Sequence, residues 1–416
     1  MEYIEEIQEQ VILVGVQLDE NDNVKESLDE LEELADTAGA QTVGKIIQNR
    51  ETVHPGTYIG KGKIEEVRAL MLATDATGII CDDELSPAQM NNLEHELECK
   101  VMDRTLLILD IFAKHATTSE GKIQVELAQL RYRASRLVGL GASLSRLGGG
   151  IGTRGPGEKK LESDRRLIRK RITALKEELS QVEKHRELLR TGRTRGKMKT
   201  AAIVGYTNAG KSTLLNQLTG AGIPANNRLF DTLDTTSRLL TVSDNLDVVL
   251  SDTVGFIAKL PHHLVNAFHA TLEELEYADL LLHVIDASDP NREEHIQVVN
   301  RLIAQLAKPE TPVLRCYNKA DLVSPADIPV GEDVVALSAR SGAGCQELLQ
   351  AIERALNHAR HHVVMTLPYS MGGQVETLHN NARVIGVDYS AEGIVVEAIL
   401  DDILYGRLRD YVTKEC

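Results

Sequence analysis

Short apolar runs alternate with amphipathic stretches over the first part of the chain. The runs at 11–16, 78–81 and 99–102 have the length and composition of buried strands, and the stretches at 24–38, 62–74 and 86–97 carry apolar residues at helical spacing. Ser86 followed by Pro87 is typical of a helix start. The pattern predicts a small α/β domain at residues 1–115.

Two longer amphipathic stretches follow, separated by a glycine-rich segment. Apolar residues recur at steps of three and four from Ile123 to Leu137, and they keep a near-heptad register from Leu161 to Leu189. Apolar positions at this spacing form a stripe along each helix and favour two helices packed along their stripes. Either stripe could also be buried against a domain core. Residues 139–157 are too rich in glycine to form a core, and we expect them to be mobile. The prediction is a helical coiled-coil hairpin at 116–195 with a Gly-rich tip (139–157), and then a basic connector at 191–199.

The third region, residues 198–358, contains apolar runs separated by helical segments, at 201–204, 247–251, 280–285, 312–316 and 334–337. This alternation predicts a mostly parallel sheet with helices on both faces, which binds its ligand beyond the carboxyl ends of the strands. The last region, 361–416, has strand-like runs at 382–387 and 393–398 and a helical end, and it reads as a small α+β domain. The fold class is therefore α/β.

The overall composition restricts the class of protein. A chain of 416 residues with 42% hydrophobic and 26% charged residues is typical of a soluble protein of several domains. No run of about 18 apolar residues is present, the acidic N-terminus lacks the features of a signal peptide, and five scattered cysteines fit reduced thiols. We expect a cytoplasmic monomer, with peripheral membrane association left open.

The charge is unevenly distributed. The net charge is −16, yet residues 131–199 carry 20 Lys and Arg against 7 Asp and Glu. A basic segment within an acidic protein is typical of a nucleic-acid-binding surface, although charged helices are often only solvated faces. Arg146 and Arg154 lie within the Gly-rich tip, and a flexible basic tip on a stiff hairpin suits insertion into an RNA surface.

The strongest motif is G-x-x-x-x-G-K-S at 205–212, between an apolar strand and a helix. Its glycines let backbone N–H groups surround phosphate oxygens, its lysine neutralises the β- and γ-phosphates, and its serine offers a hydroxyl to Mg²⁺. The helix N-terminus adds its partial positive charge. The predicted nucleotide contacts are Gly205, Tyr206, Thr207, Asn208, Ala209, Gly210, Lys211, Ser212 and Thr213.

A D-x-x-G motif follows about 40 residues later, at the end of a predicted strand. Its members are Asp252, Thr253, Val254 and Gly255. The aspartate can hold Mg²⁺ through water, and the glycine N–H can sense the γ-phosphate. The next residue is Phe256, whose ring cannot polarise water. We therefore expect slow intrinsic hydrolysis that a partner accelerates.

Two further motifs indicate guanine. They are Asn318, Lys319, Ala320 and Asp321, and then Ser338, Ala339 and Arg340. An aspartate accepts two hydrogen bonds from the N1–H and N2–H₂ edge of guanine, which adenine cannot offer. The asparagine amide can complement N7, the lysine stem can lie along the base, and a backbone N–H of the second motif can meet O6. GTP is therefore predicted over ATP.

A switch loop is expected between the first two motifs. It includes Phe230, Asp231, Thr232, Leu233 and Asp234. One hydroxyl here should complete the Mg²⁺ shell and close over a γ-phosphate. Three threonines compete for that role, Thr232, Thr235 and Thr236.

Taken together, GYTNAGKS, FDTLD, DTVGF, NKAD and SAR resemble the GTPase branch of the Obg-, Era- and TrmE-like proteins. The stretches VMDRTLLILDIFAKHATTSEGKIQVELAQL and GGGIGTRGPGEKKLESDRRLIRKRI narrow the resemblance to the HflX family of ribosome-associated GTPases. It covers about residues 1–358 and is highly specific there. The C-terminal region is less diagnostic.

This resemblance implies a Mg²⁺-dependent GTPase that binds ribosomes, chiefly the 50S subunit, and helps split or rescue them under stress. The N-terminal domain and the Gly-rich tip would contact ribosomal RNA. The catalytic candidates are Lys211, Thr232 and Gly255, and the metal ligands are Ser212 and Thr232. The chain has Asp234-Thr235-Thr236 where the family commonly has D-P-T, which keeps Thr236 as a second candidate.

Two other functions stay open at this point. One is a GTP-dependent switch acting on a protein or membrane target, which would show little of the salt dependence of RNA binding. The other is an ATPase acting on RNA through the loop Gly60–Lys63. That loop precedes a helix and could bind a phosphate, but it lacks P-loop spacing and also fits an ordinary tight turn.

Overall fold

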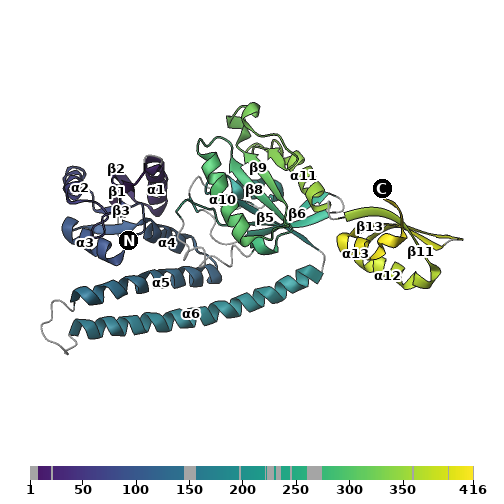
Figure 1. Cartoon of the computed structure of the whole chain (residues 1–416), viewed down its shortest axis with the longest axis horizontal. Coiled ribbons are helices and arrows are strands. Elements are labelled where there is room, and N and C mark those ends of the chain that lie inside the picture. Colours follow the sequence, from purple (N-terminus) through teal and green to yellow (C-terminus); the bar gives the residue numbers. More distant parts are fainter. Residues whose placement is uncertain are drawn as a thin grey trace, which may run out of the picture.

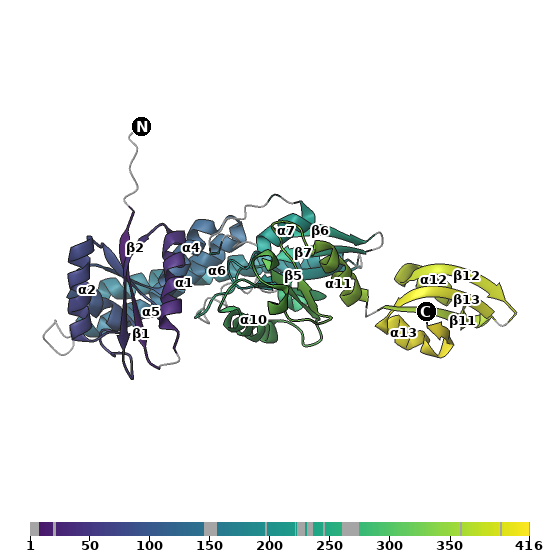
Figure 2. The ribbon, with the colours of Figure 1, turned by 90° about the horizontal axis from the view of Figure 1, so that it is seen from above.

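Three sheet-containing domains lie in a row along the molecule (Figures 1 and 2). The computed structural model describes residues 8–19, 22–144, 156–195, 198–220, 222, 229–230, 236–243, 246–259, 274–357, 360–391 and 393–415. A long helical pair runs beneath the first two domains (Figure 1). Within the described residues, no helix is both long enough and apolar enough to cross a lipid bilayer.

The N-terminal domain is a four-stranded parallel sheet in the order β2-β1-β3-β4. Helices α1 and α4 cover one face of the sheet, and α2 and α3 cover the other. Its elements are β1 (Gln10–Gln17), α1 (Val24–Ala38), β2 (Gln41–Asn49), α2 (Lys61–Thr74), β3 (Gly78–Cys81), α3 (Pro87–Leu97), β4 (Lys100–Asp103) and α4 (Arg104–His115). The predicted strands and helices are confirmed, and Ser86 caps α3 in a capping box.

The helical pair consists of α5 (Ser119–Leu144) and α6 (Pro156–Arg195), which pack side by side (Figure 1). Leu175 of α6 is fully buried in the seam. Helix α5 packs against both α6 and the N-terminal domain. Its residues Val125, Ala128 and Tyr132 belong to the apolar cluster of the N-terminal domain. Both interpretations of its apolar periodicity are therefore correct: α5 forms a seam with α6 and also buries residues against a domain core.

The extent of the Gly-rich tip was predicted wrongly. Residues 139–144 are helical, as are 156–157, and α6 also takes in most of the predicted connector at 191–199. Each glycine in a helix costs only about 1 kcal/mol, which long neighbouring helices can offset, and Pro156 suits a first helical turn. Residues 145–155, with Arg146 and Arg154, lie outside the described residues.

The central domain is a six-stranded sheet in the order β10-β9-β8-β5-β7-β6, parallel except for β6. Its strands are β5 (Lys199–Gly205), β6 (Thr236–Ser243), β7 (Leu246–Asp252), β8 (Leu280–Asp286), β9 (Val313–Asn318) and β10 (Val334–Ala336). Helix α10 (Arg292–Leu306) covers one face, and α7 (Lys211–Thr219) and α11 (Cys345–Asn357) cover the other. The predicted mostly parallel sheet is confirmed.

The C-terminal domain is an antiparallel sheet in the order β12-β13-β11-β14, with its own apolar cluster. It contains β11 (Arg360–Leu367), α12 (Gly372–Asn381), β12 (Arg383–Ser390), β13 (Gly393–Asp401), α13 (Asp402–Leu408) and β14 (Val412–Glu415). The α+β prediction is confirmed, but the chain ends on a strand rather than on a helix.

Candidate functional site

The predicted phosphate-binding loop connects β5 to α7, as the sequence indicates. Gly210 has φ +93°, and a Cβ there would lie 2.2 Å from Asn318 Nδ2, so only glycine fits. The Lys211 side chain is buried, and its Nζ donates to the Tyr206 carbonyl at 2.7 Å. Burial lowers the pKa of Lys211 to about 8, against the opposing charge of Asp252. The backbone of the predicted phosphate-binding loop thus holds the Lys211 ammonium group in place.

The D-x-x-G segment lies directly against this loop. Parallel pairing of β5 with β7 brings Ser212 Oγ within 2.8 Å of Asp252 Oδ2. Beyond the strands the pairing continues, because Phe256 donates to the Gly205 carbonyl and accepts from the Thr207 N–H. Gly255 packs so closely on Thr207 and Lys211 that an added Cβ would clash. The two motifs therefore meet as predicted.

The base-recognition motifs are joined by a contact that the sequence did not reveal. Asn318 is buried, its Nδ2 donates to the Ala209 carbonyl at 2.8 Å, and its Oδ1 accepts from the Ala339 N–H at 2.9 Å. One side chain therefore fastens both base-recognition segments to the phosphate loop. Lys319 has φ +59° and its Nζ pairs with Asp286 at 2.6 Å.

Asp321 stands in a short 3₁₀ helix, Ala320–Leu322, with an exposed side chain. Ser338 and Ala339 are buried after β10, and Arg340 is exposed. Asp321 thus lies exposed at the carboxyl edge of the sheet, the position predicted for base recognition.

The switch loop is only partly described. Asp231, Thr232, Leu233, Asp234 and Thr235 lie outside the described residues. Phe230 is buried, and its ring packs edge-on against Phe112 of α4 at 4.7 Å between centroids. Thr236 is the first residue of β6 and pairs in register with Asp252. Phe256 is also buried in the same apolar cluster as Phe112 and Phe230.

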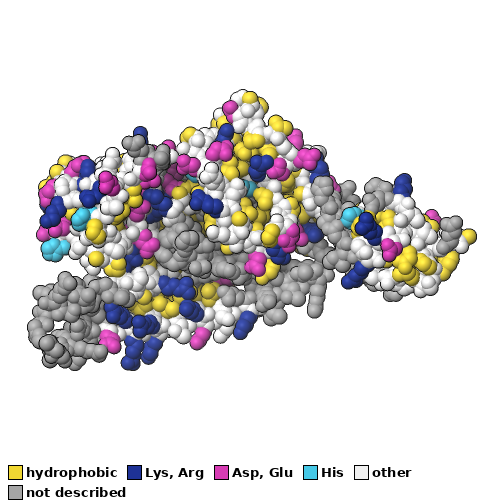
Figure 3. All heavy atoms as spheres, in the orientation of Figure 1, with side chains coloured by type: hydrophobic (Ala, Val, Ile, Leu, Met, Phe, Trp, Pro, Cys, Tyr) yellow, Lys and Arg dark blue, Asp and Glu magenta, His cyan; other side chains and the backbone are white. Residues whose placement is uncertain are grey.

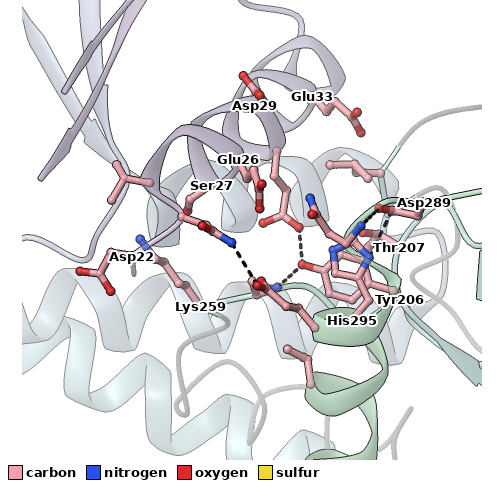
Figure 4. Close-up of a pocket in the computed structure, with 18 of the residues that line it drawn as sticks. Asp22, Glu26, Ser27, Asp29, Glu33, Tyr206, Thr207, Lys259, Asp289 and His295 are labelled. Carbon is pink, nitrogen blue, oxygen red and sulfur yellow. Dashed lines mark hydrogen bonds and ion pairs between the residues drawn. The ribbon is translucent and has the colours of Figure 1, made fainter. Parts of the chain in front are cut away.

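A cavity of about 760 Å³ separates α1 of the N-terminal domain from the phosphate loop (Figure 4). Acidic side chains from both domains line it, and Thr207, Tyr206 and His295 close its other side (Figure 4). The Tyr206 hydroxyl hydrogen-bonds Glu30 of α1, and its ring stacks on His295. Sequence reasoning missed this cavity, because no local pattern indicates which surfaces of two domains meet.

The loop Gly60–Lys63 is engaged within the N-terminal domain. The Gly60 N–H at the start of α2 donates to Gln48 Oε1 at 2.8 Å, and His54 and Tyr58 form a β-bridge just before it. Tyr58 is buried and donates to Asp83 at 2.6 Å. These contacts fit the tight-turn alternative.

Three family models cover most of the chain. They describe a "GTP-binding GTPase N-terminal" region at 25–113, a "GTP-binding GTPase Middle Region" at 115–193 and a "50S ribosome-binding GTPase" at 200–319. A solved GTP-binding protein of Sulfolobus solfataricus in complex with GDP aligns with 84% of this chain and 99% of that chain, at 24% identity and a TM-score of 0.45.

Curated relatives match over nearly the full length. The GTPase HflX of Lacrimispora saccharolytica is 52% identical over 98% of this chain and 97% of its own. The GTPase HflX of Escherichia coli is 46% identical over 86% of each chain. Among the described residues, the phosphate loop, the D-x-x-G segment and the Asn318 and Ser338 motifs lie together at one edge of the central sheet. The chain belongs to the HflX family of GTPases.

Proposed function

We propose that this GTPase depends on Mg²⁺, binds ribosomes in a GTP-regulated way, chiefly through the 50S subunit, and splits or rescues ribosomes under stress. The observation that carries the proposal is the match of residues 200–319 to a 50S ribosome-binding GTPase model. The named relatives at 52% and 46% identity support the same reading.

The nucleotide would lie across the loop Gly205–Thr213. Lys211 would exchange the Tyr206 carbonyl for the β- and γ-phosphates, and the Gly255 N–H would contact the γ-phosphate. Asp321 would accept hydrogen bonds from the guanine edge, with the Lys319 stem beside the base and the Ala339 segment near O6. Asn318 would keep the phosphate and base sites at a fixed separation.

The residues present fit a Mg²⁺ ion. Ser212 Oγ and the Asp252 carboxylate meet at 2.8 Å, which brings together two oxygen donors of the kind that Mg²⁺ prefers. Ser212 would ligate the ion directly, Asp252 would hold it through water, and Thr232 of the switch loop would supply the other hydroxyl. Bound there, the ion would neutralise charge on the phosphates.

Intrinsic hydrolysis to GDP and phosphate would be slow. The Phe256 side chain is 2% exposed and lies in the apolar cluster, so it cannot orient a water molecule. The large ribosomal subunit would order the site and accelerate the reaction, as expected where a catalytic group is missing from the free enzyme.

The helical pair offers a surface for ribosomal RNA. Lys and Arg side chains gather along the face of this pair that Figure 3 shows. Arg166, Arg169 and Lys170 are exposed in the first half of α6, whereas Arg171 pairs with Glu126 at 2.8 Å. Phosphate contacts from such a row are strong and salt-sensitive. We assign the RNA contact to this row together with the Gly-rich tip.

The test is GTP turnover with and without purified 50S subunits. In one variant a Gly-Ser linker of equal length replaces residues 145–155, which leaves α5 and α6 whole, and in another Arg146 and Arg154 become glutamate. We expect 50S subunits to stimulate the wild type strongly and both variants weakly. A wild-type rate that 50S subunits leave unchanged would contradict the ribosomal role, and undiminished stimulation of the variants would contradict the assignment of the tip.

A further inference from the structure

A buried histidine, His283, lies next to the phosphate loop, and nucleotide binding as proposed above does not use it. It lies on β8, is 1% exposed and pairs in register with Val204, one residue before the loop begins at Gly205. Burial, together with the charges of Arg315 and Lys211, lowers its pKa to about 4. The imidazole is therefore neutral at ordinary pH, and each ring nitrogen can make one hydrogen bond, as donor or as acceptor.

Two buried polar atoms near the loop have no hydrogen-bond partner among the described residues. They are Nδ1 of His283 and Oγ1 of Thr207. Thr207 is 7% exposed, so bulk water satisfies neither group. An unpaired buried donor or acceptor costs free energy, and native structures supply a partner for most such groups. Both atoms are therefore expected to have a partner that the polypeptide itself does not provide.

Thr207 and His283 line the same small cavity. Its volume is about 10 Å³, about the least that holds one water molecule. Asp289 and His295 also line this cavity and make part of its wall polar, and Figure 4 shows both of them with Thr207. A polar cavity of this size suits a water molecule that hydrogen-bonds to two to four groups, whereas apolar cavities stay empty. One water molecule is thus a partner that both unpaired atoms can share.

Thr207 lies at a point of the loop where such a bond would matter. Its N–H donates to the Phe256 carbonyl at 2.8 Å, and its Cγ2 lies only 2.8 Å from the place that a Cβ on Gly255 would take. The next residue, Asn208, has φ +58°, a left-handed conformation that is uncommon outside glycine and must be held by its surroundings. A bond from the Thr207 side chain to the sheet would help to hold this turn, on which the direction of the loop N–H groups depends.

We propose that Thr207 and His283 hold one water molecule between the phosphate loop and β8, and that this bridge fixes the loop in the conformation that binds nucleotide. His283 is then a positioning residue, which acts on the nucleotide through the water molecule and Thr207 and touches no phosphate itself. The Thr207 hydroxyl bonds toward the sheet and not toward the γ-phosphate. The proposal rests on nucleotide binding at this loop, as proposed above, and not on the ribosomal role.

The test measures dissociation constants of the full-length protein for GDP and for the non-hydrolysable analogue GppNHp. Thr207→Val keeps the methyl group against Gly255 and removes the hydroxyl, so both constants should rise by about five-fold, the effect of one lost hydrogen bond. Thr207→Ser keeps the hydroxyl and removes the methyl group, and it should bind both nucleotides more tightly than Thr207→Val does. A role of Thr207 in packing alone predicts the reverse order.

The other end of the bridge gives a second measurement. His283→Leu should raise the same constants by a similar factor, and His283→Asn, which keeps a polar atom near the place of Nδ1, should raise them less. The double variant Thr207→Val with His283→Leu should bind about as well as the weaker single variant, because both changes break one bridge, whereas independent effects would multiply to about 25-fold. The matched control is Thr105→Val, a change in α4 of a threonine that is 1% exposed and whose Oγ1 also lacks a partner among the described residues. It should leave both constants at the wild-type values.

A crystal structure of the wild type should show a water molecule within hydrogen-bonding distance of Thr207 Oγ1 and His283 Nδ1, and melting curves check that the variants fold. A crystal structure in which both atoms bond to protein groups instead would overturn the bridge, whichever variants fold. Multiplied effects in the double variant, or an effect of Thr207→Val on GppNHp alone, would also overturn it, because the hydroxyl would then act without His283 or on the γ-phosphate.

Lys211→Ala separates the bridge from the function on which it rests. Unchanged GDP affinity in Lys211→Ala would show that the loop is not the nucleotide site, and the proposed function would fail. Loss of GDP affinity in Lys211→Ala, with none in Thr207→Val or His283→Leu, would reject the bridge alone.

Discussion

At the scale of single residues, our proposal assigns guanine selection to the exposed carboxylate of Asp321. In Asp321→Asn an amide faces the N1–H and N2–H₂ edge, so one acceptor is replaced by a donor that meets another donor. We expect affinity for GDP to fall by at least about 100-fold and affinity for xanthosine diphosphate, which has an oxygen in place of the amine, to rise. Dissociation constants for both nucleotides test this. Asp327→Asn, an exposed carboxylate in the next 3₁₀ helix, serves as the control.

His283 makes stability depend on pH. It is 1% exposed on β8, and burial lowers its pKa to about 4, with the charges of Arg315 and Lys211 adding to the effect. The unfolded chain binds a proton near pH 6.5 and the folded chain does not, so stability falls as the pH drops from about 6.5 to about 4. The loss from this group between pH 7 and 5 should be about 2 kcal/mol.

Urea unfolding at pH 7 and pH 5 measures this effect. His283→Leu should lose less stability than the wild type over the same interval. Asp82 contributes little between pH 7 and pH 5. Its pKa in the folded protein is lowered from the ordinary value of 3.8, so the stability it provides is lost only at a pH below about 3.8. A variant that loses as much stability as the wild type would assign the pH dependence to other groups.

Local spacing made most of the candidate site predictable at this scale, and tertiary contacts account for the rest. The phosphate loop and the D-x-x-G segment each follow a buried strand, so their meeting at one edge of the sheet follows from parallel pairing. The two hydrogen bonds of Asn318 and the hydroxyl contacts of Tyr206 could not be predicted in this way. They depend on how loops and domains far apart in sequence pack together.

At the scale of elements, the packing of α5 on α6 can be tested by comparing the stability effects of a buried and an exposed leucine of α6. Leu175 is fully buried in α6, whereas Leu167 on the same helix is 69% exposed. Leu175→Ala should destabilise the protein by about 3 kcal/mol, because it removes buried methyl groups and leaves a cavity. Leu167→Ala should change stability by no more than about 0.5 kcal/mol. Chemical denaturation of both variants tests this, and equal effects would contradict the seam.

Elements with a clear apolar period were predicted, and those with mixed patterns were not. β2 and β6 place polar or charged residues among their apolar ones, as in Gln41-Thr42-Val43-Gly44-Lys45, so neither shows the continuous run of a buried strand. Helix α4 follows β4 without a break, because Asp103 ends the strand and also caps the helix through its carboxylate. The helical state of Gly139 and Gly141 shows that neighbouring turns can override a poor local propensity.

At the scale of the whole molecule, the domains divide into a linked pair and an independent unit. One apolar cluster spans the N-terminal and central domains and contains Phe112, Phe230 and Phe256. The C-terminal sheet buries its residues in a separate cluster. Motion of the switch segments is therefore expected to reach the N-terminal domain and the helical pair first, and the helical pair carries the surface to which we assign the RNA contact.

This division predicts that the C-terminal domain can be removed without loss of the chemistry. All candidate nucleotide contacts lie between 205 and 340, and residues 360–415 carry their own apolar cluster. In a chain truncated after Asn357, GDP affinity and intrinsic GTP turnover should stay within about two-fold of the full-length values, because sites without shared partners act independently. Turnover assays and the melting temperature of the remaining domains check this. A large fall in turnover with unchanged melting would show that the C-terminal domain acts on the nucleotide site, and the independence inferred from the separate clusters would be wrong.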